Sequence, residues 1–290
     1  MLIVNQIENT HFSKTEKEIV DYIIDQGMNI EKMSANEIAR NTFTSAPLLV
    51  RIAKKLGYSG FNEFKSAYLK ELSYMLEETD VDASIPFLLS DDLMTITKNL
   101  ALLEKETIQD TQQLNHHDDL QEAVRLLQKA QVIDVYGVLD HVLLAKHFKT
   151  LMMYIGKDVQ VIDQVTGQKR SACLADESHC AIITSYSGQT REMVQVAEPY
   201  HKRNIPFISI TCMAENSISR LADVHLYLSS REMLHIKIGD FASTTSLKYL
   251  FDILYAGVFS YDYKKNLETK IVVASYVDDR QSEDEYINEK

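Results

Sequence analysis

A run of hydroxyl side chains around one glycine carries the strongest chemical signal in the sequence. It lies between an apolar stretch and a helical pattern, and it consists of Ser185, Tyr186, Ser187, Gly188, Gln189 and Thr190. Hydroxyls and backbone N–H groups at the start of a helix can hold an anion, because the positive end of the helix dipole lies there. Gly188 allows the main chain to approach a ligand closely. This hydroxyl loop (residues 185–190) therefore predicts an anion site, although a serine-rich turn without a ligand has the same composition.

The hydroxyl loop belongs to a segment in which apolar stretches alternate with helical patterns from Gln131 onward. The predicted strands are Val132–Tyr136, Val159–Ile162, Cys180–Thr184, Phe207–Thr211 and Val224–Leu228. The predicted helices are Val142–Tyr154, Gly167–Ala175, Thr190–Lys202 and Phe241–Tyr261, with a short turn at Ser217–Leu221. This alternation predicts an α/β fold with a doubly wound, mainly parallel five-stranded sheet. Ligands of such sheets bind beyond the carboxyl ends of the strands, where the hydroxyl loop lies.

The N-terminal quarter of the chain predicts consecutive short helices and almost no strand. S-x-x-E capping boxes begin two of them, at Ser13–Glu16 and Ser34–Glu37, and Gly27 ends the first helix. A third helix begins after Ser45, which is a favourable N-cap, and ends at Gly57. Two short helices joined by a tight turn form a helix-turn-helix pattern.

Basic side chains gather around this third helix. Between Thr44 and Lys70, five basic residues and one acidic residue leave a local net charge of +4. Each phosphate that a cation neutralises releases a condensed counterion, so such a cluster favours DNA binding. By spacing and charge alone, a helical bundle with a solvated basic face fits equally well.

Three N-terminal stretches resemble the DNA-binding domain of RpiR/MurR-type transcriptional regulators: Met33–Ala39, Ser45–Arg51 and Lys54–Lys65. The last is the most specific and reads KKLGYSGFNEFK. The resemblance covers most of residues 1–77. It implies that the third helix is a recognition helix, and that the segment after it folds a further helix back onto the bundle.

The recognition helix departs from the family pattern at two positions. Leu48 replaces a small polar residue, and an apolar side chain there can touch a thymine methyl but reads no donor or acceptor. Ile52 replaces an aromatic residue and is expected in the core. Arg51 is the candidate for a guanine edge or a phosphate. The predicted DNA-binding residues are Ser34, Thr44, Ser45, Leu48, Arg51, Lys54 and Lys55.

The hydroxyl loop and Asn216–Asp223 resemble the phosphosugar signature of SIS (sugar isomerase) domains, over about residues 115–265. The resemblance implies that the hydroxyls of Ser185, Ser187 and Thr190 hold phosphate oxygens. The backbone that frames the phosphate would belong to Tyr186, Gly188 and Gln189.

The loop after the first strand departs from the SIS pattern. A SIS domain has G-x-G-x-S there, whereas residues 137–141 read GVLDH. Leu139 would crowd a close backbone approach, and His141 replaces the serine that faces the sugar. His141 could donate to a phosphate, the site could be remodelled for another ligand, or it could be partly lost. Gly137 and His141 complete the predicted ligand-binding set.

The remaining segments connect or extend these two parts. Residues 78–92 are acidic, which predicts a linker, and Asp92–Leu114 predict one long helix with an apolar face. Because such a face packs against a domain or a partner subunit, we expect a homodimer or homotetramer. The predicted organisation is an all-α helix-turn-helix domain over 1–77, a linker and connecting helix over 78–114, a SIS domain over 115–265 and an acidic C-terminal tail over 266–290.

The composition excludes several classes of protein. With 45% hydrophobic and 25% charged residues, the chain is neither wholly disordered nor collagen-like. The sequence lacks a run of about eighteen apolar residues and a signal-peptide pattern, so we expect a cytoplasmic protein without a membrane partner. The net charge of −12 argues against general affinity for nucleic acid. Cys173, Cys180 and Cys212 form no C-x-x-C pair and are expected to be buried, inert thiols.

We therefore expect a regulator of carbohydrate metabolism that binds operator DNA and senses a phosphorylated sugar. The alternative is a sugar-phosphate isomerase, which requires a positioned general base. The candidates are Glu192, His201 and His235, but none lies in a catalytic motif, and a helix-turn-helix has no use in an isomerase. Residues His116–Asp119 resemble a metal cluster only in composition and are expected in an exposed interhelix turn. We expect no enzyme activity, cofactor or metal site.

Overall fold

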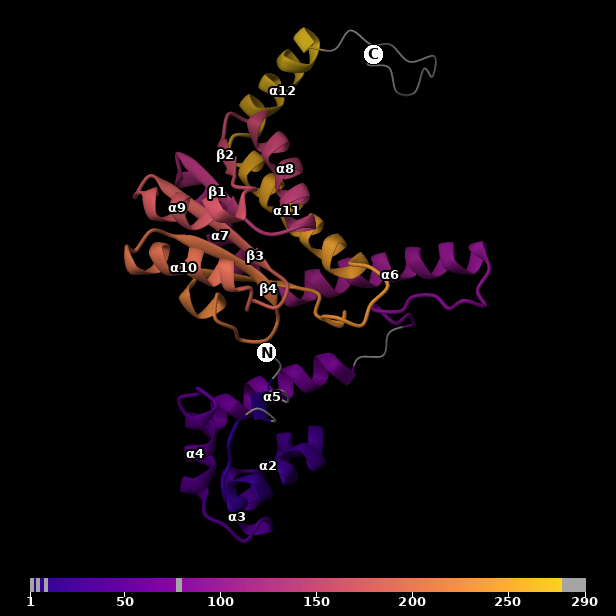
Figure 1. The fold of residues 1–290 in the computed structure, drawn as a ribbon, viewed down its shortest axis with the longest axis vertical. Helices are drawn as coiled ribbons and strands as arrows, with labels where there is room; N and C mark the ends of the chain where they lie inside the picture. Colours follow the sequence, from indigo (N-terminus) through magenta and orange to yellow (C-terminus); the bar gives the residue numbers. More distant parts are fainter. Residues whose placement is uncertain (1–2, 4–5, 8–9, 77–79, 278–290) are drawn as a thin grey trace. The chain divides into compact units, whose positions relative to one another are not determined.

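The structure is a computed structural model in which residues 3, 6–7, 10–76 and 80–277 are described (Figure 1). The chain separates into two compact units. The first holds Met1–Glu106, Cys212–Asn216 and Ser230–Gly239, and the second holds Thr107–Thr211, Ser217–Ser229 and Asp240–Lys290. The helix-turn-helix region lies in the first unit and the sheet in the second. The functional boundaries at residues 77, 114 and 265 stay predictions.

Short helices form the N-terminal part of the first unit, and both predicted capping boxes are confirmed. The Ser13 hydroxyl accepts from the Glu16 backbone N–H, and the Ser34 hydroxyl accepts from that of Glu37. Each glutamate carboxylate in turn accepts from the backbone N–H of its capping serine. The elements are α2 (Lys14–Gln26), the 3-10 helix η1 (Gly27–Lys32), α3 (Ala35–Asn41), α4 (Ala46–Lys55) and α5 (Phe61–Leu76).

The ends of α2 and α4 lie where the glycines and serines predict them, with one correction. Ser45 has the extended backbone of an N-cap, but its side chain makes no capping hydrogen bond to α4. Pro47 occupies the first turn instead, where its fixed φ favours the helix and its missing N–H is no loss. Gly27 and Gly57 take positive φ values of 51° and 94°. These values confirm them as helix stops, because side chains disfavour that conformation.

The apolar faces of these helices share one core. Its fully buried members include Ile19, Ile23, Ile38, Leu49 and Phe64. Ile52, expected in the core, is confirmed there. Leu48 is partly buried and packs against the same core, so contacts within the protein favour an apolar residue at this position.

The predicted long helix is confirmed as α6 (Leu93–Leu114). Residues 80–92 before it, all of them described, contain no helix or strand. Asp82 shapes this segment, because its Oδ1 accepts from the N–H groups of Ser84 at 2.7 Å and Ile85 at 3.0 Å. The last turns of α6 belong to the second unit, where Thr111 Oγ1 lies 2.8 Å from Ser246 Oγ.

The described residues of the second unit form a five-stranded sheet with the order β2-β1-β3-β4-β5. The pairs β1–β2, β1–β3 and β3–β4 are parallel, and Val135 of β1 lies opposite Val161 and Ile182. The strand order reverses at β1, which confirms the predicted doubly wound sheet. The strands are β1 (Val132–Tyr136), β2 (Asp158–Val161), β3 (His179–Ser185), β4 (Phe207–Cys212) and β5 (Val224–Leu228).

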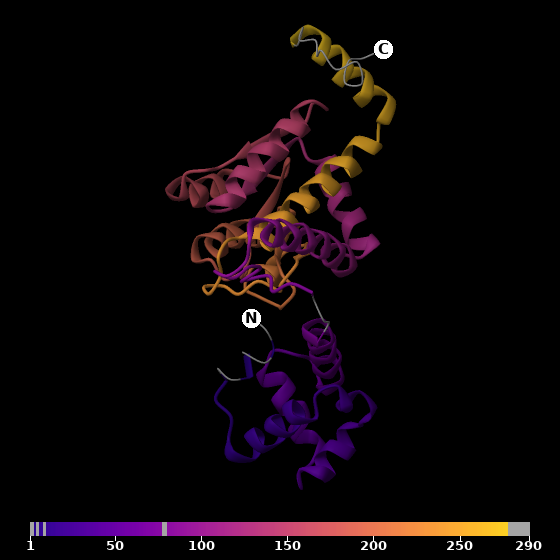
Figure 2. The same cartoon turned by 90° about the vertical axis from the view of Figure 1, so that its right-hand side faces the viewer.

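Helices cover both faces of this sheet, with α8 and α11 on one side and α9 and α10 on the other (Figures 1 and 2). Ile133 and Val135 of β1 face the core that α8 and α11 share with α7, whereas Tyr136 faces the core beside α10. This alternation follows from the period of two along a strand. The helices are α7 (His117–Lys129), α8 (Asp140–Met153), α9 (Val165–Leu174), α10 (Arg191–Lys202), α11 (Phe241–Ser260) and the 3-10 helix η2 (Ser219–Leu221).

Two helices of the second unit were not predicted. α7 begins at His117, directly after its N-cap His116, so His116–Asp119 form a helix start rather than a turn. Residues Tyr263–Val277 form α12, and the acidic residues 278–290 of the predicted tail lie outside the described residues. Among the described residues, no helix combines the length and the apolar composition needed to span a bilayer.

Candidate functional site

α4 presents a polar face that carries predicted DNA-binding residues. Arg51 and Lys54 lie three residues apart and therefore share a face of the helix. The Arg51 side chain is 67% exposed, and Lys54 is also exposed. Leu49 and Ile52 bury the opposite face in the core. The basic groups thus point outward, as contact with a DNA groove requires.

The hydroxyls of two other predicted DNA-binding residues have partners within the protein. Ser34 Oγ donates to Glu37 Oε2 at 2.7 Å, as part of the capping box of α3. Thr44 Oγ1 lies 2.8 Å from Thr42 Oγ1 in the turn between α3 and α4. Phe43 in the same turn has a φ of 52° and is 97% exposed. Ser34 therefore fixes the start of α3, whereas Thr44 shapes the turn that presents α4.

Glu16 was predicted only as a capping residue, but it also joins α2 to α4. Its Oε1 accepts from Arg51 Nε at 3.2 Å, and its Oε2 accepts from Lys55 Nζ at 2.8 Å. The hydrogen bond from Lys55, followed by that from the Ser13 backbone, lowers the pKa of Glu16 to about 2. No pattern in the sequence indicates this second role, because a capping box reports only contacts within one helical turn.

The hydroxyl loop lies at the carboxyl end of β3 and leads directly into α10. Ser185 Oγ and Thr190 Oγ1 lie 2.8 Å apart, so the two ends of the loop meet. Gly188 takes a φ of 63°, and its N–H donates to the Ser185 carbonyl at 3.1 Å. The Gln189 N–H donates to Ser187 Oγ at 3.2 Å. The predicted hydroxyls are thus held together beside a helix N-terminus, which lowers the entropy cost of ordering them around a ligand.

The loop after β1 lies next to the hydroxyl loop, because β1 and β3 are neighbours in the sheet. Thr184 Oγ1 donates to the Tyr136 carbonyl at 3.1 Å. A Cβ on Gly137 would lie only 2.6 Å from that same Thr184 Oγ1. A glycine is therefore required where the two strand ends approach one another. The structure brings both predicted ligand motifs to the same edge of the sheet.

The two unusual residues of the β1–α8 loop differ in environment. Leu139 is the N-cap of α8, with φ 52° and ψ −123°, and its side chain is 85% exposed. Such a sparsely populated backbone conformation costs a residue other than glycine about 1–3 kcal/mol. His141 lies in the first turn of α8 and is partly buried, next to Gly137.

Two polar residues that were not predicted as site residues support these loops. Ser217 Oγ donates to Gln189 Oε1 at 2.7 Å and so links the hydroxyl loop to the segment before η2. Gln168 Nε2 of α9 donates to the carbonyls of Gly137 at 2.8 Å and Ile162 at 2.9 Å. Ser217 lies within the SIS-like motif 216–223, and this motif could have predicted it as a site residue. No pattern in the sequence indicates Gln168.

Of the two candidate general bases in the second unit, Glu192 lies beside the hydroxyl loop and His201 does not. His201 lies eleven residues after Thr190 on α10, or about 16 Å along the helix axis, and contacts the Leu221 carbonyl at 2.9 Å. Glu192 is exposed in the first turn of α10, where a carboxylate complements the helix dipole. His235 is exposed in the first unit.

The expected burial of the cysteines is wrong for one of the three. Cys180 is buried, and its burial raises the pKa of the thiol well above the ordinary range. Cys212 is partly buried, but Cys173 is exposed at the end of α9.

His117 Nδ1 contacts the exposed Asp118 carboxylate at 3.1 Å. Within the described ranges, no three His, Cys, Asp or Glu side chains are grouped as a metal site requires.

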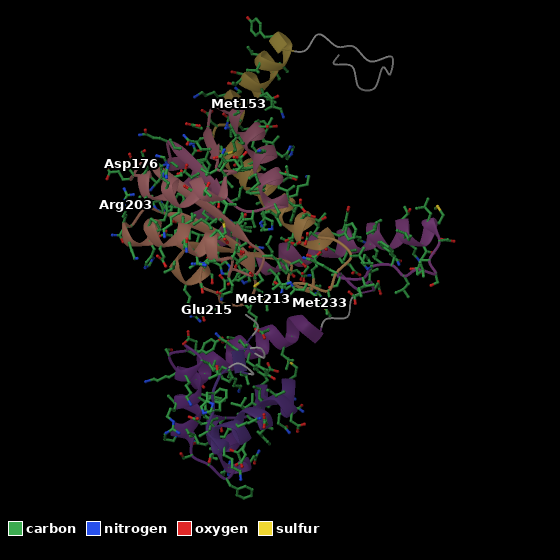
Figure 3. The ribbon with its side chains drawn as sticks, in the orientation of Figure 1. Met153, Asp176, Arg203, Met213, Glu215 and Met233 are labelled. Carbon is green, nitrogen blue, oxygen red and sulfur yellow. The ribbon has the colours of Figure 1, made fainter. Side chains whose placement is uncertain are left out.

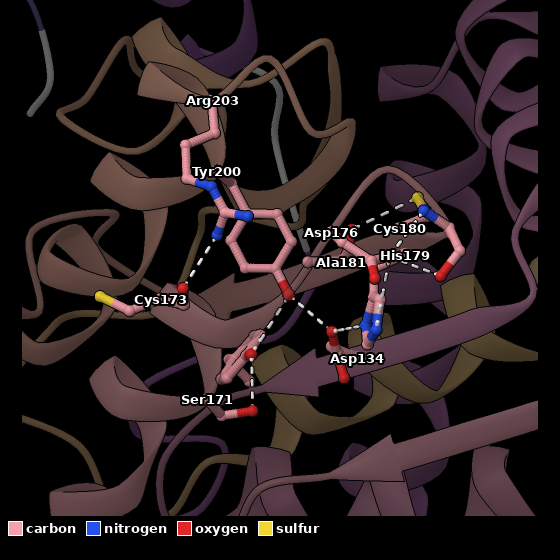
Figure 4. A network of polar contacts seen from close by, with 11 residues as sticks. Asp134, Ser171, Cys173, Asp176, His179, Cys180, Ala181, Tyr200 and Arg203 are labelled. Atoms are coloured by element: carbon pink, nitrogen blue, oxygen red, sulfur yellow. Dashed lines mark hydrogen bonds and ion pairs between the residues drawn. The ribbon is translucent and has the colours of Figure 1, made fainter.

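A buried polar network crosses the other end of the sheet (Figure 4). Asp134 Oδ2 accepts from the Tyr200 hydroxyl at 2.6 Å and contacts His179 Nδ1 at 2.7 Å. The Tyr136 hydroxyl lies 3.2 Å from that of Tyr200 and extends the network. Burial raises the pKa of both tyrosines, that of Tyr136 to about 12. Asp176 and Arg203 lie at the surface on this side of the unit (Figure 3). His179 begins β3 and Ser185 ends it, about 20 Å away, so the His179 end of the network lies far from the hydroxyl loop.

Comparisons with known proteins agree with this architecture. Residues 1–75 match the family model described as "Helix-turn-helix domain, rpiR family", and residues 126–249 match that of the SIS domain. Two relatives are named uncharacterized HTH-type transcriptional regulators. TTE0211 of Caldanaerobacter subterraneus subsp. tengcongensis is 26% identical, over 88% of this chain and 89% of its own. YbbH of Bacillus subtilis is 26% identical, over 86% and 87%.

A solved structure shares the fold over nearly the whole chain. The NanR protein of Vibrio vulnificus, complexed with ManNAc-6P, has a TM-score of 0.61 and 24% identity. The match covers 96% of this chain and 98% of that one.

The fold and the family matches define a helix-turn-helix protein that also carries a SIS domain. Residues 1–75 are similar to the helix-turn-helix domain of the rpiR family, and both relatives are named HTH-type transcriptional regulators. The resemblance found in residues 33–65 and 185–223 is thereby confirmed.

Proposed function

We propose that this chain regulates genes of carbohydrate metabolism by binding operator DNA through α4 and a phosphorylated sugar through the hydroxyl loop. The observation that carries the proposal is the hydroxyl loop itself. Its hydroxyls are held together at the N-terminus of α10, beside a glycine of the neighbouring strand end. A chain that acts on operator DNA works in the cytoplasm.

The exposed basic face of α4 supports the DNA half of the proposal. Arg51 and Lys54 are exposed and would reach phosphates or base edges, and Ser45 is exposed at the start of the helix. Each phosphate contact makes affinity fall as salt rises, because counterions are released on binding. A two-fold symmetric oligomer would bind half-sites about 34–36 Å apart, or a multiple of that spacing.

The effector half rests on three hydroxyls and on the backbone N–H groups at the start of α10. Ser185, Ser187 and Thr190 would donate to phosphate oxygens, and the helix dipole favours the negative charge. Gly137 and His141 would border the ligand from the neighbouring loop. NanR of V. vulnificus has the same fold and was solved with ManNAc-6P, so this compound belongs among the first ligands to test.

The SIS domain of this chain is proposed to bind its ligand without converting it. An isomerase would need a base beside the bound sugar. His201 lies at the far end of α10, and Glu192 in its first turn is exposed and complements the helix dipole. The ligand would then act by binding the DNA-competent and DNA-incompetent states with different affinities. Couplings of about 1–3 kcal/mol are typical, which corresponds to about 5–150-fold in DNA affinity.

The test is fluorescence anisotropy with DNA from upstream of the chain's own gene, at two salt concentrations, with a panel of sugar phosphates. We expect salt-sensitive binding that one sugar phosphate shifts. The double variant Ser187→Ala with Thr190→Ala should bind DNA normally and lose that shift. A matched double variant, Thr150→Ala with Ser275→Ala, removes exposed hydroxyls of the same unit and should keep it.

Three results would contradict the proposal. A response that survives the Ser187/Thr190 double variant would exclude the hydroxyl loop as the phosphate site. Turnover of any sugar phosphate in the panel would support the isomerase alternative. If the chain binds the upstream DNA no more tightly than random DNA, its proposed role as a regulator would be excluded.

A further inference from the structure

We propose that Glu16 is a positioning residue that directs Arg51 toward DNA and keeps the neighbouring Lys55 in a structural contact. The inference rests on the proposed DNA binding by α4. It divides the basic residues of α4 into DNA-contacting and fold-stabilising groups, a division that charge pattern alone does not give.

Glu16 contacts the Arg51 guanidinium on its Nε side only. Its Nε donates to Glu16 Oε1 at 3.2 Å, while 67% of the side chain remains exposed. An arginine has five N–H donors in a planar fork, so a contact through Nε leaves the two Nη groups for a bidentate contact. Those groups are the ones that pair with a phosphate or with guanine O6 and N7. The Glu16 contact thus fixes the plane of the fork without occupying its DNA-facing edge.

Lys55 uses its ammonium within the protein. Its Nζ donates to Glu16 Oε2 at 2.8 Å and to the His11 carbonyl at 3.1 Å. The same Nζ lies 5.4 Å from the centre of the Phe12 ring, within the range of a cation–π contact. These partners lie in or just before α2, so Lys55 ties α4 to the segment in front of it. The neighbouring Lys54 is exposed and shares the Arg51 face.

Glu16 is itself fixed in place. Its side chain is 3% exposed, and its Oε2 also accepts from the Ser13 N–H at 2.8 Å. Both oxygens therefore have defined partners, and the carboxylate has little freedom to follow a mobile arginine. Because Glu16 brings a negative charge close to the DNA-binding face, simple electrostatics predicts that its removal strengthens DNA binding. Positioning predicts the opposite sign.

The experiment measures whether the loss of the Glu16 charge weakens or strengthens DNA binding. Glu16→Gln removes the charge but keeps an oxygen acceptor, and glutamine is compatible with a capping box. Glu18→Gln removes the same charge from an exposed position on the same helix and is the matched control. We expect Glu16→Gln to weaken binding to specific DNA about five- to twentyfold, with Glu18→Gln neutral or slightly tighter.

A double-mutant cycle separates positioning from loss of structure. In an Arg51→Ala background, Glu16→Gln should change DNA affinity by less than about twofold, since there is no guanidinium left to direct. An equal loss in both backgrounds would assign Glu16 a purely structural role and overturn the proposal. Tighter binding by Glu16→Gln, matching Glu18→Gln, would overturn it as well. Circular dichroism of each variant shows whether the helices are retained.

The two adjacent lysines provide a second, independent test. Lys54→Ala should weaken DNA binding and reduce the salt dependence by about one counterion, whereas Lys55→Ala should chiefly lower the melting temperature. Equal losses of DNA affinity at both positions would contradict the division of roles, even if Glu16→Gln failed to fold. If the unmodified chain does not bind DNA at all, the proposed function fails, which is a distinct result.

Discussion

The helix-turn-helix region and the sheet bury polar groups in opposite ways. In the helix-turn-helix region, Glu16 stays ionised because cations surround it, and the Lys55 hydrogen bond lowers its pKa to about 2. In the sheet, burial instead disfavours the charged forms of Tyr200 and His225, and it lowers the pKa of His225 to about 4. The helix-turn-helix region orders a surface that would bind DNA. The sheet orders a buried framework that supports the β1–α8 loop and the hydroxyl loop.

The difference shows what each site depends on. The basic face of α4 is displayed by a small bundle of helices, in which neighbouring helices fix single side chains. The hydroxyl loop depends on strand ends that meet only when the sheet is complete, as the Thr184–Tyr136 contact shows. We therefore expect the sheet to respond to changes in buried polar groups, and the helix-turn-helix region to changes in surface charge.

The largest expected difference between the regions is their response to mild acid. The folded second unit favours the neutral His225 ring, whose Nε2 contacts Thr211 Oγ1 at 2.8 Å, while the unfolded chain binds a proton near pH 6.5. Stability from this site is complete above pH 6.5 and falls as the pH drops toward 4, by up to about 3 kcal/mol. Glu16 contributes with the same sign but at lower pH: its stabilisation is complete above pH 4.5 and is lost toward pH 2.

Urea denaturation read by pulse proteolysis can follow peptides of each unit separately between pH 7 and 4. Peptides of the sheet should lose protection in this range before those of α2 and α4. His225→Gln should flatten the pH dependence of the sheet, whereas His117→Gln, at an exposed histidine of the same unit, should not. A sheet as stable at pH 4 as at pH 7 would show that His225 does not govern its acid response.

Gly137→Ala addresses the contact between strand ends and should have the next largest effect. The added Cβ would lie 2.6 Å from Thr184 Oγ1 and 2.9 Å from His141 Cβ, so the two loops must move apart. We expect a loss of about 2 kcal/mol in the free energy of unfolding of the second unit, together with a weaker effector response. Gly167→Ala on α9 is the control, because its Cβ meets nothing closer than 3.8 Å. It should be neutral or stabilising by about 0.5–1 kcal/mol. Equal effects of the two variants in urea denaturation would contradict this account.

The fold was predictable where the signals are local. Two capping boxes, the helix stop at Gly57 and the apolar strand stretches each depend on residues a few positions apart, and the structure confirms them. The hydroxyl loop was placed correctly at a strand end for the same reason. α7 is not among the predicted helices although Leu120, Val124 and Leu127 recur at helical spacing, because the polar composition of His116–Asp119 is typical of a turn.

The partners of the site residues were not predictable from a single sequence. Glu16 meets Arg51 across 35 positions, Ser217 meets Gln189 across 28, and neither pair leaves a periodic trace. Such contacts are fixed by the packing of whole helices and by crossovers between strands. The strain at Leu139 was also hidden, because its positive φ follows from the route of the β1–α8 loop rather than from its own preference.

The smallest expected effect compares strained turns in the two regions. Phe43 before α4 and Leu139 before α8 both take a φ of 52°, and both side chains are largely exposed, so little burial offsets the strain. Replacing either with glycine relieves the strain but increases the entropy of the unfolded chain, which leaves a gain of about 0.5–1 kcal/mol. Asn204→Gly is the control, because asparagine tolerates its φ of 54° and little strain is left to relieve. Thermal unfolding of the three variants measures the gains. A gain in stability at Phe43 without one at Leu139 would mean that contacts in the β1–α8 loop already compensate the strain of Leu139. The two regions would then differ in how they tolerate backbone strain.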